Sequence, residues 1–195
     1  MNARSRLLLG VVVVLTVSGC GSPAPVLVPV APPPASAGPK LPPRPMTLKI
    51  EGIGPCSLVS ADQRRTLGVE QGDLRPGGGL ITGLSCAWST TQTRPRSAIA
   101  GSLLTSPGAE FALGKDPMRF VQGFATTSTT SIGTDPRWYC TMFVDIGPGQ
   151  SLKTDYDNST QDIPGMNHDL ACAKAQQLAE YMLTALKARQ PRQPR

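Results

Sequence analysis

Prolines divide the chain into a segment that cannot fold on itself and a segment that can. Residues 21–46, GSPAPVLVPVAPPPASAGPKLPPRPM, hold 10 prolines in 26 positions. Each proline fixes φ and removes a backbone hydrogen-bond donor, so helix interiors and sheet ladders are both blocked. We expect a stiff tether, which would reach about 80 Å if it were fully extended as polyproline II. A folded core must therefore come from the residues that follow.

The residues before the tether have the pattern of an export signal. Two arginines, Arg4 and Arg6, precede an apolar run over residues 7–17, which is too short to cross a bilayer core of about 30 Å. The run ends in VSGC, residues 17–20, which resembles the lipobox of bacterial lipoproteins. That resemblance implies that residues 1–19 are a signal peptide and that Cys20 becomes the lipid-modified first residue. The alternative is an ordinary secretory signal in which this cysteine is accidental.

A lipid on Cys20 would fix where the protein works. Each acyl methylene buried in the bilayer contributes about 0.8 kcal/mol to membrane binding. Two acyl chains therefore hold a protein on a membrane, where one chain gives only marginal binding. We therefore expect the membrane to be a partner through the Cys20 anchor, with the chain on the extracytoplasmic face of the cell membrane.

Residues 47–187 are long enough for a single domain, and residues 188–195 are expected to form a basic, disordered tail. The chain has 19 Lys and Arg against 13 Asp and Glu, a formal net charge of +6. Eight of the basic residues lie in the signal, in the tether and in residues 187–195, which leaves 11 against 13 in between. Because the domain itself is slightly acidic, we expect no nucleic-acid partner.

Four further cysteines remain: Cys56, Cys86, Cys140 and Cys172. An even number outside the cytoplasm predicts two disulfides, although four cysteines allow three pairings. We expect Cys56–Cys86 and Cys140–Cys172, because each closes a local loop of about 30 residues and stabilises the fold by about 3.6 kcal/mol. The wide spacing and a single histidine argue against a zinc site, and no metal or cofactor is expected.

Local signals predict the first elements. Ser60, with Gln63 three residues on and Gly68 as a stop, predicts a capped helix over residues 61–67. Residues 84–89 alternate and predict a strand, and residues 97–105 predict another. Ser106 and Pro107 predict the cap and first position of a helical turn that runs through GAEFAL.

The second half of the domain predicts a hairpin followed by a helix. RWYCTMFVDI alternates, and GPGQ turns the chain into SLKTDY. Asp169 is expected to cap a helix over residues 170–187, whose apolar stripe is Ala171, Ala175, Leu178, Ala179, Met182 and Leu186. A Cys140–Cys172 bridge would join this helix to the hairpin. The prediction is an α+β fold: an antiparallel β-sheet with a long C-terminal helix packed across one face, and two disulfides.

These segments together carry a resemblance. GPCSLVSADQRRTLG, CAW, WYCTMFVDIG and DLACAKAQQLAEYMLTAL follow one another behind the lipobox and the tether. The order resembles an uncharacterised family of small actinobacterial secreted lipoproteins. The resemblance implies location and architecture, but the family has no established activity and no catalytic motif.

Candidate chemistry is sparse. The only histidine, His168, has Asp162 and Asp169 nearby but no Gly-x-Ser-x-Gly elbow in the chain, so we expect a turn residue and no catalytic residues. The glycine-rich residues 76–83 lack the ending of a phosphate loop and are expected to form a flexible loop.

Two other groups are also expected to be structural. Asp155, Asp157 and Asp162 depart from the EF-hand spacing, which favours a solvated turn over a calcium site. The aromatic residues Trp88, Trp138 and Tyr139 alternate beside cysteines, which favours core packing over a ligand pocket.

We therefore expect a membrane-anchored, extracytoplasmic lipoprotein that acts as a non-enzymatic binding or accessory module of the cell envelope. Its partner would be an envelope protein or a small ligand. The alternative is a carrier that shields a lipid or another apolar ligand between sheet and helix, and the third hypothesis is a hydrolase.

Overall fold

The computed structural model describes residues 40–77, 81–90, 97–130, 138–158 and 164–191. They all belong to one compact unit, which runs from Ala37 to Arg195. Cys20, the leader and most of the proline-rich segment lie outside the described residues. Within the described ranges, no helix is both long enough and apolar enough to span a membrane.

The described residues form an antiparallel seven-stranded sheet in the order β1-β2-β3-β7-β6-β5-β4. The strands are β1 (Asp73–Pro76), β2 (Thr82–Ser89), β3 (Ser97–Ser106), β4 (Arg119–Val121), β5 (Phe124–Thr130), β6 (Trp138–Gly147) and β7 (Gln150–Asn158). The helices are α1 (Ala61–Leu67) and α2 (His168–Ala188), with the 3-10 turns η1 (Pro55–Leu58) and η2 (Ala109–Ala112). The central strand β7 pairs with its hairpin partner β6 on one side and with β3 on the other.

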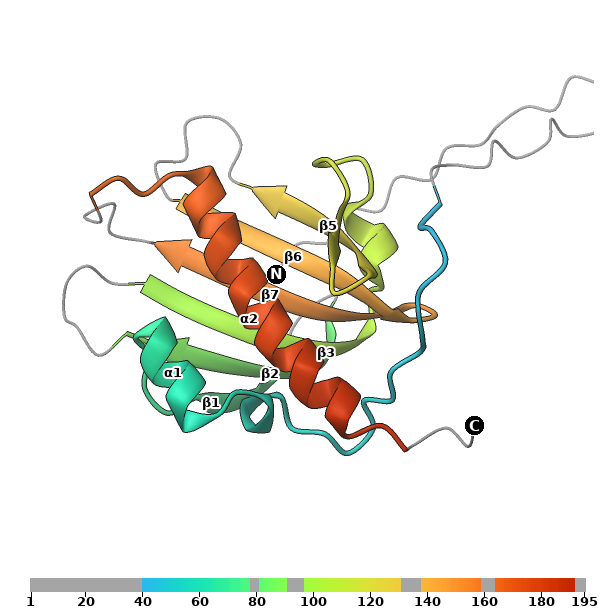
Figure 1. Cartoon of the computed structure of the whole chain (residues 1–195), viewed down its shortest axis with the longest axis horizontal. Coiled ribbons are helices and arrows are strands. Elements are labelled where there is room, and N and C mark those ends of the chain that lie inside the picture. Colours follow the sequence, from blue (N-terminus) through green and yellow to red (C-terminus); the bar gives the residue numbers. More distant parts are fainter. Residues whose placement is uncertain (1–39, 78–80, 91–96, 131–137, 159–163, 192–195) are drawn as a thin grey trace, which may run out of the picture. The chain divides into compact units, whose positions relative to one another are not determined.

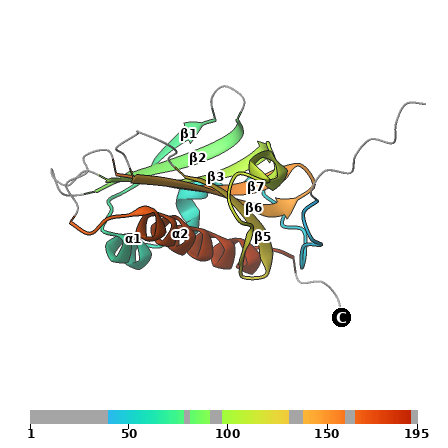
Figure 2. The same ribbon diagram turned by 90° about the horizontal axis from the view of Figure 1, so that it is seen from above.

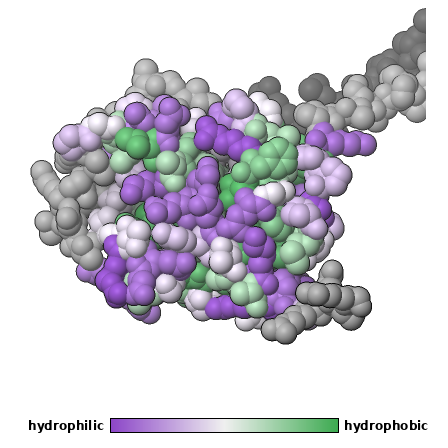
Figure 3. Space-filling model, in the orientation of Figure 1, coloured by the Kyte–Doolittle hydropathy of each residue, from purple (hydrophilic) through white to green (hydrophobic). Residues whose placement is uncertain are grey.

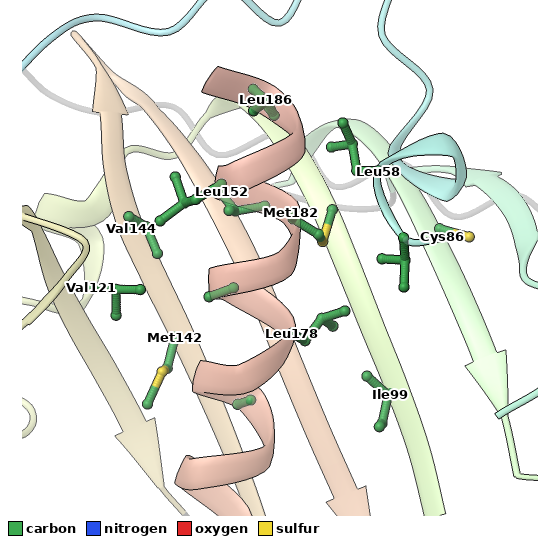
Figure 4. Packing of buried hydrophobic residues seen from close by; sticks show 14 of the residues in the cluster. Leu58, Cys86, Ile99, Val121, Met142, Val144, Leu152, Leu178, Met182 and Leu186 are labelled. Atoms are coloured by element: carbon green, nitrogen blue, oxygen red, sulfur yellow. The ribbon is translucent and has the colours of Figure 1, made fainter. Parts of the chain in front are cut away.

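Helix α2 packs diagonally across one face of the sheet (Figures 1 and 2). All six residues of the expected stripe are buried. Figure 4 shows Leu178 and Met182 of α2 lying among Leu152, Val144 and Ile99 of the strands. The α+β prediction is therefore confirmed. The apolar stripe of the helix is buried because the sheet presents an apolar face to it.

Two disulfides fasten the peripheral elements to the sheet. Cys56–Cys86 joins η1 to β2, and Cys140–Cys172 joins β6 to the first turns of α2. Both pairings confirm the prediction from loop length.

The N-terminal cap of α1 is the one that the sequence predicts, whereas the cap of α2 is a different residue from the predicted one. Ser60 and Gln63 form the expected capping box of α1, and Gly68 ends that helix at a φ of 69°. For α2, however, the cap is Asn167, whose side chain accepts the amide of Leu170 at 2.9 Å, so the prediction of Asp169 was wrong. Asn and Asp cap equally well, and the local sequence offers both.

The turn after β3 also starts later than expected. Ser106 still belongs to β3, the Ser106–Pro107 bond is cis, and η2 begins at Ala109 behind Gly108. Ser106 therefore does not cap a helix, because its backbone is still part of the strand.

Three strands were not predicted: β1, β4 and β5. β5 carries the sequence FATTSTT, which lacks apolar alternation, yet Thr126, Thr127 and Ser128 are all buried. Their hydroxyl groups find partners, since Thr127 donates to the carbonyl of Ala109 at 2.6 Å and buried polar groups are tolerated when they are hydrogen-bonded.

Both ends of the described unit make contacts with its body. Leu41 packs against the cluster around Leu104 and Phe143, and Arg44 pairs with Asp145. At the other end, Arg189 donates to the Ser57 hydroxyl at 2.8 Å and to the Ser57 carbonyl at 2.7 Å.

Candidate functional site

The two faces of the sheet are covered to different extents. The face toward α2 carries the main core, and we call the opposite face the outer face. At one end of the outer face, η2 packs Ala109 and Ala112 over Leu104 and Phe143. Farther along the outer face, toward Ala98 and Tyr139, the described residues line a hollow.

A pocket of about 310 Å³ lies in this open part of the outer face. We call it the outer-face pocket, and its lining residues are Ala98, Ala100, Tyr139, Thr141, Asp155, Tyr156 and Asp157. They come from β3, β7 and β6, three neighbouring strands. Its volume is at the lower end of the range for small-molecule sites.

The strand register arranges the lining in two rows. Asp157 of β7 lies between Ala98 of β3 and Tyr139 of β6. In the next row, Asp155 lies between Ala100 and Thr141. Side chains directly opposite one another on antiparallel strands have Cβ atoms about 4.5–5.5 Å apart. The small side chains of β3 therefore leave space beside two carboxylates, and an aromatic ring and a hydroxyl lie on the other side.

The carboxylate of Asp155 is fully engaged. The Thr141 hydroxyl donates to its Oδ1 at 2.6 Å, and the Lys153 ammonium donates to its Oδ2 at 2.7 Å. This charge is therefore matched within the sheet by Lys153.

The carboxylate of Asp157 has no such partners among the residues that the structure describes. Its Oδ1 atom is buried and accepts no hydrogen bond in the described part of the chain. An unsatisfied buried acceptor costs about 1–3 kcal/mol, more when it is charged, so this atom favours any donor that enters the pocket.

The pKa of Tyr156, next to Asp157, is raised by its surroundings. Burial raises the pKa of its phenol above the ordinary value, a hydrogen bond with Ser97 opposes that shift, and the negative charge of Asp157 adds to it. Because the net shift is upward, the phenol stays neutral at physiological pH.

His168 is separated from the outer-face pocket by the sheet. It is the first residue of α2, and its ring meets Trp138 edge-on at a centroid distance of 4.8 Å. Trp138 packs against the main core, on the side of the sheet that α2 covers. His168 is therefore the first residue of a helix, and the prediction of a turn residue was wrong, because the helix begins two residues earlier than expected. Asp162 lies outside the described residues.

The structure divides the other candidates. Trp88 is buried in the core as predicted, whereas Tyr139 lines the outer-face pocket instead. Asp155 and Asp157 belong to β7 and not to a turn, because pairing with β3 and β6 continues to Asn158.

The glycine-rich segment also contributes to strands. Pro76 ends β1, and β2 begins at Thr82, while residues 78–80 lie outside the described ranges. Among the residues with a described position, no cluster of three or more His, Cys, Asp or Glu side chains has the geometry to hold a metal ion.

Sequence reasoning missed the outer-face pocket, although a signal was present. Lys153, Asp155 and Asp157 repeat at every second residue, which places them on one face of a strand. Ala98 and Ala100 do the same in β3. What could not be read was that β3 and β7, about 50 residues apart, lie side by side.

A second hollow, of about 420 Å³, lies along the solvent side of α2. Its lining comes from that one helix and is mostly polar, including Lys174, Gln176, Gln177 and Glu180. Figure 3, which views this side, shows hydrophilic side chains across the middle of the face. One helix cannot enclose a ligand, so the outer-face pocket is the better candidate.

Comparison with known proteins adds a family but no activity. No curated protein and no solved structure shows significant similarity to this chain. A family model described as a protein of unknown function (DUF3558) matches residues 15–185. The match spans both the described domain and the proline-rich segment before it. The chain therefore belongs to the DUF3558 family of proteins of unknown function.

Proposed function

We propose that this protein is a lipid-anchored, extracytoplasmic binding module, and that it holds a small ligand in the outer-face pocket. The observation that carries this proposal is the composition of the pocket. An aromatic ring, two alanines and a partly unsatisfied carboxylate meet in a hollow of about 310 Å³ on the part of the sheet that the core does not use. Binding sites combine apolar lining with a few polar groups in this way.

The anchor part of the proposal rests on the leader and the VSGC motif. The first described contact with the sheet is made by Leu41, so 20 residues separate it from Cys20. An extended polyproline segment of that length would span at most about 60 Å. The start of the domain at Leu41 would then lie within this distance of the membrane surface.

The structure favours a ligand on the outer face over a lipid carried between sheet and helix. The space between α2 and the sheet is filled by side chains such as Leu178, Met182 and Leu152, all fully buried (Figure 4). Packing at this density leaves a carried lipid no room without separating the helix from the sheet. The Cys140–Cys172 bridge opposes that separation.

A binding role also suits the pocket better than catalysis. The aliphatic hydroxyl group in its lining, that of Thr141, donates to a carboxylate that a lysine already neutralises. That arrangement holds side chains in place, and activation of a nucleophile instead requires a base free to take its proton.

The anchor is tested by expressing the full chain and its Cys20→Ala variant in a bacterial host that processes lipoproteins. The expected result is a membrane-bound product whose N-terminal peptide carries acyl groups on Cys20, and release of the variant from the membrane. An unmodified Cys20 with the leader still attached would overturn this part.

The pocket is tested by filling it. Ala100→Phe places a ring in the outer-face pocket, and Ala173→Phe places the same ring on the exposed side of α2 as a control. Cell-envelope extract is applied to both variants and to the wild type, and ligands that remain bound are detected by native mass spectrometry. Loss of the bound mass in Ala100→Phe alone supports the proposal, and an identical result for all three proteins refutes it.

A further inference from the structure

We infer that the outer-face pocket recognises a positively charged group, a primary ammonium or guanidinium, on a small ligand with a short apolar part. This inference rests on the proposed binding function and adds the chemistry of the ligand. It is carried by the charge balance of the pocket and by the position of Asp157 relative to Tyr139.

The charge balance is negative. Asp155 is matched by Lys153, which lies two residues away on the same face of β7. Asp157 adds a second carboxylate, and no described cation pairs with it. Two further ion pairs of the outer face, Arg75 with Asp73 and Arg44 with Asp145, lie outside the pocket lining. Among the described side chains that line the pocket, one negative charge therefore remains unmatched.

Position decides what that charge can bind. Tyr139 lies directly opposite Asp157 on the neighbouring strand, so the ring and the carboxylate flank the same space. An ammonium between them can donate to the carboxylate and lie against the ring face. A cation–π contact of this kind contributes about 0.5–2 kcal/mol, and a charge-assisted hydrogen bond is about twice as strong as a neutral one.

The buried Oδ1 atom of Asp157 makes the selection stronger. In the free protein this acceptor has no described partner, so a donor from the ligand removes an existing penalty. A neutral alcohol can donate one hydrogen bond but leaves the charge unmatched, and a carboxylate ligand meets repulsion. The side chain opposite on β3 is Ala98, whose methyl group gives an alkyl chain an apolar surface.

The experiment uses three probes of equal length: butylammonium, butan-1-ol and butyrate. Each is titrated into the isotope-labelled full chain, and chemical shifts of backbone amides are followed by NMR. Saturable shifts centred on residues 98–100, 139–141 and 155–157 are expected with butylammonium alone. Raising the salt concentration should weaken them, because the interaction is ionic.

Variants identify the groups responsible. Asp157→Asn should weaken butylammonium binding about tenfold or more, the loss of one charge-assisted contact. Tyr139→Leu should weaken it about two- to fivefold. The control Asp73→Asn removes an exposed carboxylate on β1, outside the pocket, and should change nothing.

The outcomes separate this inference from the proposed function. If butan-1-ol binds as well as butylammonium, or if Asp157→Asn and Asp73→Asn behave alike, the charge-based inference is wrong while the pocket still binds ligands. If no probe binds but Ala100→Phe still abolishes capture of an envelope ligand, the inference fails and the binding function stands. The comparison of probes on the wild type needs no variant, so a misfolded Asp157→Asn does not protect the inference.

Discussion

The ion pair between Arg44 and Asp145 should control how firmly the start of the domain is held. The guanidinium donates from Nε to Oδ2 at 3.0 Å and from Nη2 to Oδ1 at 2.8 Å. The Asp145 side chain is 2% exposed, whereas that of Arg44 is 26% exposed. Removing the arginine should therefore destabilise the fold more than removing the charge of the buried aspartate does.

Arg44→Ala should cost about 3 kcal/mol of the free energy of unfolding, because it leaves a buried carboxylate without its counter-charge. Asp145→Asn should cost less, about 1–2 kcal/mol, because the partly exposed guanidinium can turn toward water and keeps one acceptor. Arg44→Lys should lower the free energy of unfolding by less than Arg44→Ala does, since an ammonium keeps the charge but not the bidentate geometry of the guanidinium.

Urea unfolding followed by tryptophan fluorescence, with both disulfides oxidised, measures these losses. At a slope of about 2 kcal/mol/M, the Arg44→Ala midpoint should fall by about 1.5 M. The double variant Arg44→Ala/Asp145→Asn should be more stable than the sum of the single losses predicts, because the unpaired charge is gone. If Arg44→Ala costs less than about 1 kcal/mol, or if the single losses simply add, the carboxylate is not desolvated in the way that we infer.

Three further predictions test other parts of the fold. Asn167→Ala should lower the free energy of unfolding by about 1 kcal/mol and Asp169→Ala by about half of that or less, because Asn167 makes the cap hydrogen bond; equal losses in urea unfolding would contradict this assignment. Gly101→Ala would place a Cβ against the buried Met182 sulfur and should lower the free energy of unfolding by about 1–3 kcal/mol, but by little in a Met182→Ala background. The same thermal destabilisation in both backgrounds would refute the steric explanation. The phenol of Tyr156 has a raised pKa in the folded state, so the unfolded chain releases this proton at a lower pH than the folded chain does. The contribution of the phenol to the free energy of unfolding is therefore complete below a pH of about 10 and is lost as the pH rises through the folded pKa. Urea midpoints measured between pH 9 and pH 11 should therefore fall less steeply for Tyr156→Phe than for the wild type, and parallel curves would show that this phenol is not responsible.

Features set by neighbouring residues were readable from the sequence. The α1 helix begins and ends where Ser60, Gln63 and Gly68 predict, because a capping box and a left-handed glycine act within one turn. The β6–β7 hairpin follows for the same reason, since a short turn fixes the pairing of the strands on either side. The disulfide pairing could also be predicted from the sequence, because short loops favour pairing between cysteines that are near in the chain.

The order of the strands was not readable. β3 pairs with β7 across about 50 residues, and β5 is buried although its threonines give no apolar pattern. Such positions depend on which surfaces remain after the first elements have packed, and no local rule encodes that choice.

By itself, the sequence determined the elements that form within a few residues of one another, the stripe of α2 and the cysteines that pair. Only the tertiary structure decided that Ala98, Asp157 and Tyr139 lie in one row of the sheet. The physical reason is that a helix cap or a turn is stabilised by adjacent backbone groups, whereas a pocket depends on distant strands meeting in one register. Alternation along β6 and β7 shows which residues share a face of each strand. Which strand lies beside them is set by the packing of the whole domain.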